Sequence, residues 1–301
     1  MATKITVFGE VLWDVLPSSK LAGGAPMNVA AHLNRYGLDV AFVSRVGSDD
    51  LGRDLIGYME NNGLSTRWVQ IGQTHLTGVA KANISDNHEV TYKILHPVAW
   101  DYIQFDKHAL AAVSGSDFFI YGTLASRDEM TRSTLLQYLA QARLKIFDVN
   151  LRPPHYTSDG VIELLKYADV VKMNESEVKE ICSWFATYQD IPHAMEFIKE
   201  RFDLKSVIVT CGGDGAMVLT EHGQLFRHPG FEVEVEDTIG SGDAFLAAFL
   251  YRINQGEQVN SALEFACGAG AIVASKVGAL PAFSEEDIAL MISSRNINVL
   301  K

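Results

Sequence analysis

The sequence predicts an α/β fold: a doubly wound, mostly parallel sheet flanked by helices, with a small β-sheet lid beside it. Short β-branched runs alternate with helical patterns along most of the chain. Each run is almost continuous in apolar residues, as expected for strands that are covered on both faces. The 301 residues are 48% hydrophobic and 21% charged, which is enough apolar material for one large core. We therefore expect a single domain over residues 1–301.

The elements of this fold follow one another in a regular order. The expected strands are Ile5–Phe8, Val40–Val43, Phe118–Tyr121, Lys145–Val149, Val170–Met173 and Ser206–Thr210. The expected helices between them are Asn28–Tyr36, Asp49–Asn61, Arg127–Ala142, Val161–Tyr167 and His193–Phe202. After Gly215 the pattern predicts a hairpin and then two long helices. These segments are Ala216–Thr220 with Gln224–His228, then Asp243–Asn254 and Ser261–Lys276.

Two stretches interrupt the alternation. Val11–Pro17 follows the first strand without a helix, and Arg67–Leu95 contains several strands in succession. Within the second stretch, Thr77–Ile84 and Glu89–Leu95 flank the turn-like Ser85–His88, which is typical of a hairpin. We expect residues of about 11–17 and 67–100 to form the small sheet. Two roles stay open for it: a lid that closes over a substrate, or an exposed sheet edge that pairs in a homodimer.

Charge and composition exclude several classes of function. With 25 Lys and Arg against 37 Asp and Glu, the net charge of −12 disfavours nucleic acid and anionic membranes as partners. No apolar run approaches the ~20 residues that span a bilayer, and the N-terminus runs into a strand without an apolar leader. Cys182, Cys211 and Cys267 are scattered, as is typical of reducing compartments. These features predict a cytoplasmic protein that acts on small molecules.

The segment Asp237–Phe245 has the pattern of an anion site. Gly240, Ser241 and Gly242 open an apolar helix, so small residues leave backbone N–H groups accessible at its positive end. Such a site suits a phosphoryl group in transfer, and Asp243 beside it can accept a proton from an attacking hydroxyl. In the alternative reading, Ser241 and Asp243 only cap the helix.

A second glycine motif lies near the N-terminus. Gly23 and Gly24 allow close approach of the backbone to a ligand, and Asn28 carries both donors and acceptors. Pro26 suits the first turn of a helix. Taken alone, this loop favours ordinary turn chemistry over a binding site.

Together, and in this order more than 200 residues apart, the two motifs resemble the ribokinase-like (PfkB) carbohydrate kinases, with an appearance nearest to fructokinases. Gly37 and Gly47 follow the first motif at the family's spacing. Further matches are Asp148–Arg152, Asn174–Glu177, Thr210–Gly215 and Lys276–Ala279. The resemblance covers essentially the whole chain. It implies a ribokinase-like fold and an enzyme that transfers phosphate from ATP to a sugar with Mg²⁺.

The resemblance also implies roles for single residues. Asp243 becomes the catalytic base, with Gly240, Ser241 and Gly242 as the anion hole. Asn174 and Glu177 organise Mg²⁺ and phosphate, and Glu177 acts through water. In the alternative interpretation, the segment Asn174–Glu177 is only the N-terminal cap of a helix. The nucleotide residues are Thr210, Gly212, Gly215, Gly278, Ala279 and Cys267, where Cys267 replaces an Asn of many relatives near the adenine. A K⁺-type site involves Asp237, Ile239 and the Lys276–Ala279 loop.

The acceptor side rests on the opening Gly9–Asp14, which resembles the Gly-Glu-x-Leu-x-Asp start of fructokinase-type members. Asp14 is expected to accept from two sugar hydroxyls, with Gly23, Gly24 and Asn28 completing the pocket. Three further residues have two alternative roles each. Glu10 either braces the hinge of the lid or faces solvent. Arg152 either binds a sugar or phosphate oxygen or forms a surface ion pair, and Trp100 either covers the sugar or packs within the lid.

Fructose is the favoured acceptor, and 2-keto-3-deoxygluconate is the runner-up. The latter carries a carboxylate and needs a cationic partner, for which Lys93 and Arg152 are the candidates. A nucleoside acceptor is disfavoured by the opening motif. A dinucleotide-dependent oxidoreductase lacks support because no G-x-G-x-x-G follows the first strand. A non-catalytic sugar or nucleotide sensor stays open as a reading from another class.

Overall fold

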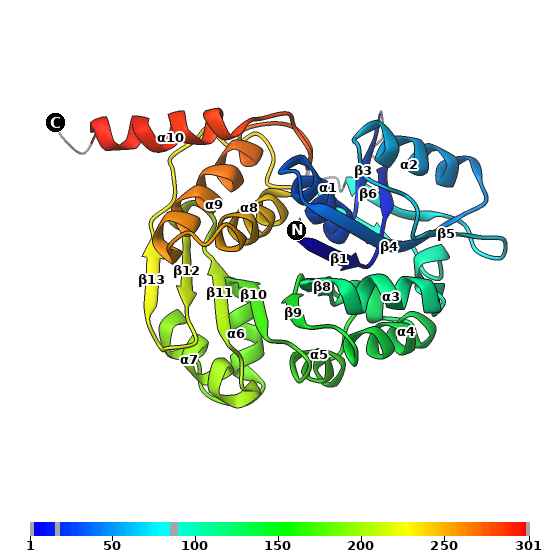
Figure 1. Ribbon diagram of the computed structural model, residues 1–301, viewed down its shortest axis with the longest axis horizontal. Helices are drawn as coiled ribbons and strands as arrows, with labels where there is room; N and C mark the ends of the chain where they lie inside the picture. Colours follow the sequence, from blue (N-terminus) through cyan, green and yellow to red (C-terminus); the bar gives the residue numbers. More distant parts are fainter. Residues whose placement is uncertain (1–2, 16–18, 85–89, 299–301) are drawn as a thin grey trace. The chain divides into compact units, whose positions relative to one another are not determined.

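The computed structural model describes residues 3–15, 19–84 and 90–298 of the chain (Figure 1). The chain divides into two compact units, Met1–Arg143 and Leu144–Lys301. Each unit combines a mostly parallel set of strands with helices, so the predicted α/β class is confirmed.

The first unit has a parallel four-stranded layer in the order β8-β1-β4-β5. Its strands are β1 (Lys4–Phe8), β4 (Asp39–Gly47), β5 (Val69–Gly72) and β8 (Phe118–Gly122). Its helices are α1 (Ala25–Arg35), α2 (Asp50–Asn61), α3 (Lys107–Gly115) and α4 (Glu129–Leu139), with the 3₁₀ turns η1 (Ala99–Tyr102) and η2 (Leu124–Ser126). Ile5, Val7 and Phe119 are fully buried, because both faces of the central strands lie in the core.

The small sheet also belongs to the first unit, in the order β3-β2-β6-β7. Its strands are β2 (Leu12–Val15), β3 (Lys20–Gly23), β6 (Gly78–Ile84) and β7 (Val90–Ile94). The β6–β7 hairpin is antiparallel, as predicted, whereas the turn expected at Ser85–His88 lies outside the described residues.

Two expectations about this sheet need correction. Within residues 67–100, β5 pairs with β4 in the larger layer instead of joining the small sheet. The reason is the length of β4, which runs for nine residues and therefore offers Ser44–Gly47 as a ladder for β5. The short edge strand β3 was not predicted, because its pattern Lys-Leu-Ala-Gly has little β-propensity.

The second unit carries strands in the order β13-β12-β11-β10-β9. The parallel strands are β9 (Leu144–Asp148), β10 (Val170–Asn174) and β11 (Ser206–Thr210), and the antiparallel hairpin is β12 (Ala216–Leu219) with β13 (Leu225–His228). The helices are α5 (Ser158–Leu165), α6 (Glu175–Ser183), α7 (Ile191–Phe202), α8 (Ser241–Asn254), α9 (Val259–Ala274) and α10 (Glu285–Asn298), with the turn η3 (Gly212–Asp214). The predicted hairpin and both long helices, α8 and α9, are confirmed. These two helices lie side by side (Figure 1).

Helices α3, α6 and α10 were not among the predicted elements. Each of these helices has polar residues in or next to its first turn. The helical repeat of apolar residues is therefore hard to detect in so short a segment. Across the part of the chain that the structure describes, no helix has both the length and the apolar character required to cross a lipid bilayer.

Candidate functional site

The N-terminus of α8 brings the predicted anion-hole residues into one turn. Gly240 precedes the helix with φ of +76°, a left-handed conformation that favours glycine. A Cβ atom added there would stand 2.5 Å from the Cβ of Ala279, so the close approach also requires glycine. The N-cap residue, Gly240, has no side chain to cap the helix, and the Ser241 hydroxyl donates to the Thr238 carbonyl. Ser241 therefore bonds to the preceding turn, and an anion site at the start of α8 stays a prediction.

The loop before α8 is held to the loop after α9 by Asp237. Its two carboxylate oxygens accept from the backbone N–H groups of Ile239, at 2.9 Å, and Gly278, at 3.2 Å. The residues expected around a monovalent cation are therefore neighbours. Among the described side chains, no group of three His, Cys, Asp or Glu residues could hold a metal ion. A K⁺ site at this loop stays a prediction.

A buried cluster of charges lies next to the start of α8. Lys172, at 6% exposure on β10, places its Nζ 2.9 Å from Oδ1 of Asp148 at the end of β9. A Cβ on Gly242 would stand 3.1 Å from the same Nζ. Burial alone would lower the pKa of Lys172, but the charges of Asp148, Glu177 and Asp243 outweigh it and raise this pKa. Lys172 therefore forms a buried ion pair with Asp148, and the charges of Glu177 and Asp243 also favour its ammonium form.

Sequence reasoning assigned no role to Lys172. The available signal was a single charged residue inside the apolar strand Val170–Asn174, which a strand covered on both faces does not tolerate without a partner. Asp148 belongs to the Asp148–Arg152 family match, which predicts no separate role for it. Its Oδ2 atom is buried and has no hydrogen-bond partner within the described residues.

Asn174 and Glu177 form a reciprocal capping box at the start of α6. The Asn174 side chain accepts from the Glu177 N–H at 2.9 Å, and Glu177 Oε2 accepts from the Asn174 N–H at 2.8 Å. Glu177 Oε1 accepts from the N–H of Leu151 at 2.8 Å. Burial raises the pKa of Glu177 more than Lys172 lowers it. Asn174 is therefore the N-cap of α6, as the alternative interpretation predicts. The capping box holds the buried carboxylate of Glu177 beside Lys172 and Asp148.

A cavity of about 170 Å³ in the second unit collects most of the predicted nucleotide residues. Its lining includes Thr210, Gly212, Gly215, Ser241, Gly242 and Cys267. Gly215 adopts φ of +80°, and a side chain there would collide with the carbonyl of His228. Gly278 and Ala279 are not part of this lining, and Ala279 lies against Gly240 instead. Sequence reasoning missed the apolar wall, which includes Phe231 and Val233.

On the acceptor side, the small sheet of the first unit brings the two N-terminal motifs together. Gly23 lies against Asp14, because a side chain on Gly23 would collide with the Asp14 carboxylate. Gly24, with φ of +112°, approaches Glu10 so closely that a Cβ would stand 2.6 Å from its carbonyl oxygen. Glu10 and Asn28 are both buried, which is contrary to the solvent-facing reading of Glu10.

The register of the small sheet separates Asp14 from Lys93. Asp14 pairs with Ala80, and Ala80 pairs with Ile94, so these three residues share one face. Lys93 pairs with Lys81, one position along, and therefore belongs to the opposite face. Lys93, the candidate cation in this unit, thus lies on the face away from Asp14.

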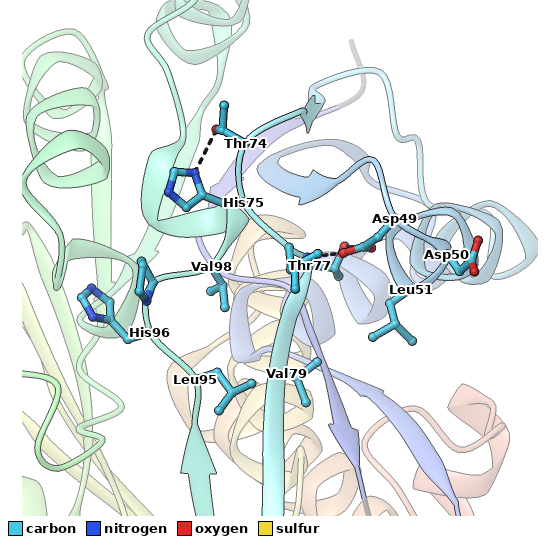
Figure 2. A pocket seen from close by; sticks show the side chains of 12 residues that line it. Asp49, Asp50, Leu51, Thr74, His75, Thr77, Val79, Leu95, His96 and Val98 are labelled. Atoms are coloured by element: carbon cyan, nitrogen blue, oxygen red, sulfur yellow. Dashed lines mark hydrogen bonds between the residues drawn. The ribbon is translucent and has the colours of Figure 1, made fainter.

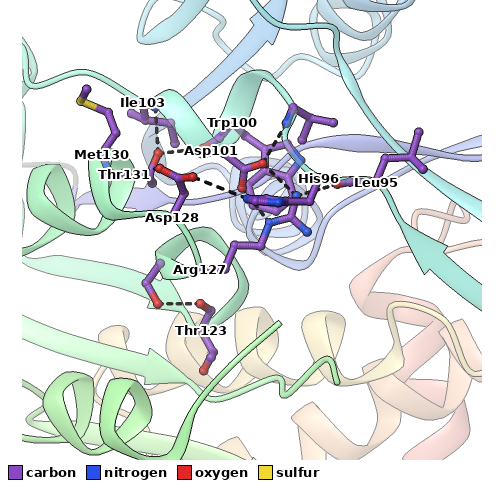
Figure 3. Close-up of polar contacts among 12 residues, drawn as sticks. Leu95, His96, Trp100, Asp101, Ile103, Thr123, Arg127, Asp128, Met130 and Thr131 are labelled. Atoms are coloured by element: carbon purple, nitrogen blue, oxygen red, sulfur yellow. Dashed lines mark hydrogen bonds and ion pairs between the residues drawn. The ribbon is translucent and has the colours of Figure 1, made fainter. Parts of the chain in front are cut away.

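Trp100 is fully buried beside a charged pair (Figure 3). The guanidinium of Arg127 lies 3.9 Å from the centre of its ring. Arg127 donates to both carboxylate oxygens of Asp101, at 2.7 and 2.9 Å, and to the carbonyl of Leu95 at 2.6 Å. A side chain on Gly78 would collide with the indole. The geometry favours the packing alternative for Trp100 over contact with a sugar.

Arg152 is exposed at the end of the Asp148–Arg152 segment. Its Nη1 donates to the carbonyl of the preceding residue, Leu151, at 3.0 Å. It forms no ion pair with any residue that the structure describes. The reading as a surface ion pair is therefore not seen, and the guanidinium keeps its donors for a ligand.

A larger hollow, of about 630 Å³, contains none of the predicted site residues (Figure 2). It lies where the loop before β6 meets the start of α2, and Asp49 there accepts from the Thr77 hydroxyl and N–H. Its Val79 pairs with Trp13 and so lies on the face of the small sheet opposite to Asp14. Size alone does not locate the site in this molecule.

The chain also resembles known proteins in sequence and fold. The sequence profile of the pfkB family carbohydrate kinases matches residues 3–286. Fructokinase-2 of Oryza sativa subsp. japonica is 28% identical over 98% of this chain and 95% of its own length. A fructokinase double mutant from Vibrio cholerae O395, bound to fructose, ADP and potassium ion, is 25% identical with a TM-score of 0.82, covering 96% of this chain and 98% of that one. The 2-dehydro-3-deoxygluconokinase of Thermotoga maritima shares the fold at 21% identity and a TM-score of 0.83, covering 97% and 99%.

Proposed function

Because the chain belongs to the pfkB family of carbohydrate kinases and is an ATP-dependent sugar kinase, we propose that its acceptor is fructose, phosphorylated at a primary hydroxyl. The observation that carries this choice is the acceptor side of the first unit. There Asp14 lies against Gly23, and Lys93, the candidate cation of the same sheet, lies on the other face. A carboxylate suits a neutral polyol, since it accepts hydrogen bonds from hydroxyl groups and repels an acidic sugar. The Oryza and Vibrio relatives named fructokinases support the same acceptor.

In the proposed reaction, Asp243 takes the proton of the attacking hydroxyl. The hydroxyl oxygen then forms a bond to the γ-phosphorus of ATP, while the bond from that phosphorus to the bridging oxygen breaks and ADP leaves. The backbone N–H groups of Gly240, Ser241 and Gly242 receive the negative charge of the transferring group. The chain contributes mainly positioning and electrostatic stabilisation.

The residues of the buried cluster fit a magnesium ion that is held largely through water. Asp148 has an orphaned buried oxygen, and Glu177 has a fixed carboxylate beside it in the electrostatic cluster. Mg²⁺ prefers carboxylate oxygens and usually keeps several of its waters. When bound, the ion neutralises phosphate charge. Lys172 holds Asp148 at 2.9 Å and so orients that carboxylate. K⁺ at the Asp237 and Ile239 loop is part of the same proposal.

A second candidate acceptor is 2-keto-3-deoxygluconate. The observation in its favour is Arg152, an exposed guanidinium without a carboxylate partner in the described residues. Such a group can bind the carboxylate of an acidic sugar in a bidentate manner. The same guanidinium can bind a phosphate or a sugar oxygen, so Arg152 does not by itself select the acidic substrate.

The acceptor is tested by an ATP-consumption screen over fructose, ribose, 2-keto-3-deoxygluconate, tagatose 6-phosphate and adenosine. We expect fructose to give the highest kcat/KM. Much faster turnover of an acidic or phosphorylated sugar overturns the choice, and binding of both ligands without turnover supports the sensor reading instead.

The role of Asp14 is tested in parallel. Asp14→Asn should lower kcat/KM for fructose by an amount equivalent to about 1.5–3 kcal/mol, the scale of a hydrogen bond to a charged group, with the KM for ATP nearly unchanged. Asp54→Asn is the matched control, because Asp54 of α2 is an exposed carboxylate paired with Lys20 on the same small sheet. Equal kinetics in the two variants would remove Asp14 from the site.

We also propose that the small sheet acts as a lid. A lid that closes over sugar should slow amide exchange in β2 and β6 when fructose is added without ATP. Protection that is the same with and without sugar contradicts the lid and supports a homodimer formed through the sheet edge.

A further inference from the structure

The cavity of the second unit has two chemically different groups of lining residues. The first group carries the phosphate-binding pattern: the glycine loop after β11 and the start of α8. The second group comes from the segment after β13 and from α9, and is almost entirely apolar. It consists of Phe231, Val233, Val235, Cys267, Gly270, Ala271 and Ala274. Phe245 of α8 joins this apolar group.

The apolar group contains little that could read the edge of a base. No amide, carboxylate, imidazole or guanidinium side chain occurs among the described residues that line the cavity. In the apolar group, Cys267 has the one side chain with a hydrogen-bonding atom, and a thiol is a weak donor and a weak acceptor.

The backbone of α9 is also engaged. Gly270 and Ala271 lie inside the helix, and the Ala271 carbonyl accepts from the N–H of Ser275 at 3.0 Å. The Ala274 carbonyl accepts from the N–H groups of Glu236 and Asp237, at 2.9 and 3.2 Å. These carbonyls are therefore already hydrogen-bonded within the protein.

Strong discrimination between similar ligands requires a buried polar group that the wrong ligand leaves unpaired. A wall of apolar side chains gives only small differences between ligands of similar shape, because it loses no hydrogen bond to either. Adenine and guanine have the same ring size and differ in their hydrogen-bonding edges. An apolar wall therefore distinguishes them poorly.

We propose that this cavity binds the purine base of a nucleoside triphosphate by shape and apolar contact, without side-chain readout of its hydrogen-bonding edge. The inference rests on the proposed function, since it makes GTP a phosphoryl donor for the same sugar. The kcat/KM for GTP should lie within about tenfold of that for ATP, the range expected of an apolar pocket. Cys267 is then the position at which base selectivity can be introduced.

The kinetic test compares the ATP-to-GTP ratio of kcat/KM in three proteins: the wild type, Cys267→Ala and Cys267→Asn. The alanine variant removes the thiol and adds no hydrogen-bonding group. Its ATP-to-GTP ratio of kcat/KM should therefore match that of the wild type. The asparagine variant places donors and an acceptor at the wall, so its ratio should change by roughly tenfold or more. A wild-type ratio above about 100, or an alanine variant that changes the ratio, overturns the proposal.

A second test does not depend on turnover. Alkylation of Cys267 by iodoacetamide is followed by mass spectrometry in the Cys211→Ser background, because Cys211 adjoins the glycine loop. Cys182, which is fully buried, serves as the internal control. ADP and GDP at equal concentrations should slow the modification of Cys267 to a similar extent.

The outcomes separate the two proposals. Protection by ADP but not by GDP overturns the inference and leaves the sugar kinase reaction intact. No protection by either nucleotide also overturns it, because the base then binds elsewhere. Equal protection in a protein that phosphorylates none of the tested sugars supports the inference and overturns the proposed acceptor.

Discussion

The two units each bury a charged cluster, and the clusters differ in balance. In the first unit, one guanidinium, Arg127, meets one carboxylate, Asp101, and both carboxylate oxygens are hydrogen-bonded. In the second unit, one ammonium, Lys172, interacts electrostatically with three carboxyl groups, and Asp148 keeps an orphaned oxygen. The first cluster pairs one cation with one carboxylate, whereas the second has more carboxyl groups than cations.

This difference indicates which cluster is structural and which belongs to the chemistry. A buried ion pair is stable when its partners are fully hydrogen-bonded, as Arg127 and Asp101 are. A surplus of buried negative charge is costly unless a bound cation compensates it, and such perturbed groups gather at functional sites. The clusters can therefore be told apart by experiments that separate stability from turnover.

The largest effect is expected at Asp243. Asp243→Asn keeps the shape of the side chain but cannot take a proton, so kcat should fall by roughly 10²–10⁴ while sugar and ATP binding change little. Steady-state kinetics with fructose measures this change. Near-normal turnover would mean that another group is the base.

Arg127 should mainly affect stability. Arg127→Met leaves the Asp101 carboxylate buried without its partner, and the free energy of unfolding should drop by about 3–5 kcal/mol. Urea denaturation measures the loss, and kcat per folded molecule should stay within about twofold of the wild type. If kcat falls as strongly as the free energy of unfolding, the Arg127–Asp101 cluster is not purely structural and the proposed difference between the two clusters is wrong.

Lys172 should show the opposite separation. Lys172→Met removes the single cation from three carboxylates, and kcat should fall by roughly 10–10², since the electrostatic environment of the transferring phosphoryl group changes. Lys205→Met is the control, because Lys205 is an exposed lysine that pairs with a carboxylate, Asp169, in the same unit. Full kcat in folded Lys172→Met protein would make the cluster purely structural.

The smallest effect is expected at Asp49, the N-cap of α2. Burial tends to raise its pKa, but hydrogen bonds from Thr77 and Gly52, with Arg53 nearby, lower it below the ordinary 3.8. A lowered native pKa stabilises the fold above the unfolded-state value, and this contribution is lost as the pH falls through the native pKa. Asp49→Asn keeps a capping oxygen but loses the negative charge, so it should cost roughly 0.3–1 kcal/mol at pH 7 and progressively less below pH 4. A difference that is independent of pH would contradict this reading.

Local patterns explain how much of the fold and site could be predicted. The apolar strand runs, the hairpin after Gly215 and the long helices depend on periodicity within one segment, and the structure has them where the pattern predicts. The glycines at positions 23, 24 and 240 were singled out from sequence, and each is required by a close backbone or side-chain approach. The edge strand β3 and the placement of β5 were missed because strand pairing depends on partners distant in sequence.

The sequence by itself determined the fold class, the family and the positions of the glycine turns, because these features are encoded in short contiguous motifs. Only the tertiary structure decided that Trp100 is buried beneath Arg127, that Lys93 lies on the face away from Asp14, and that Lys172 interacts electrostatically with three carboxyl groups. The physical reason is that burial, sheet register and electrostatic neighbours arise between segments far apart in the chain. A side chain's type is local, but its environment is set by packing.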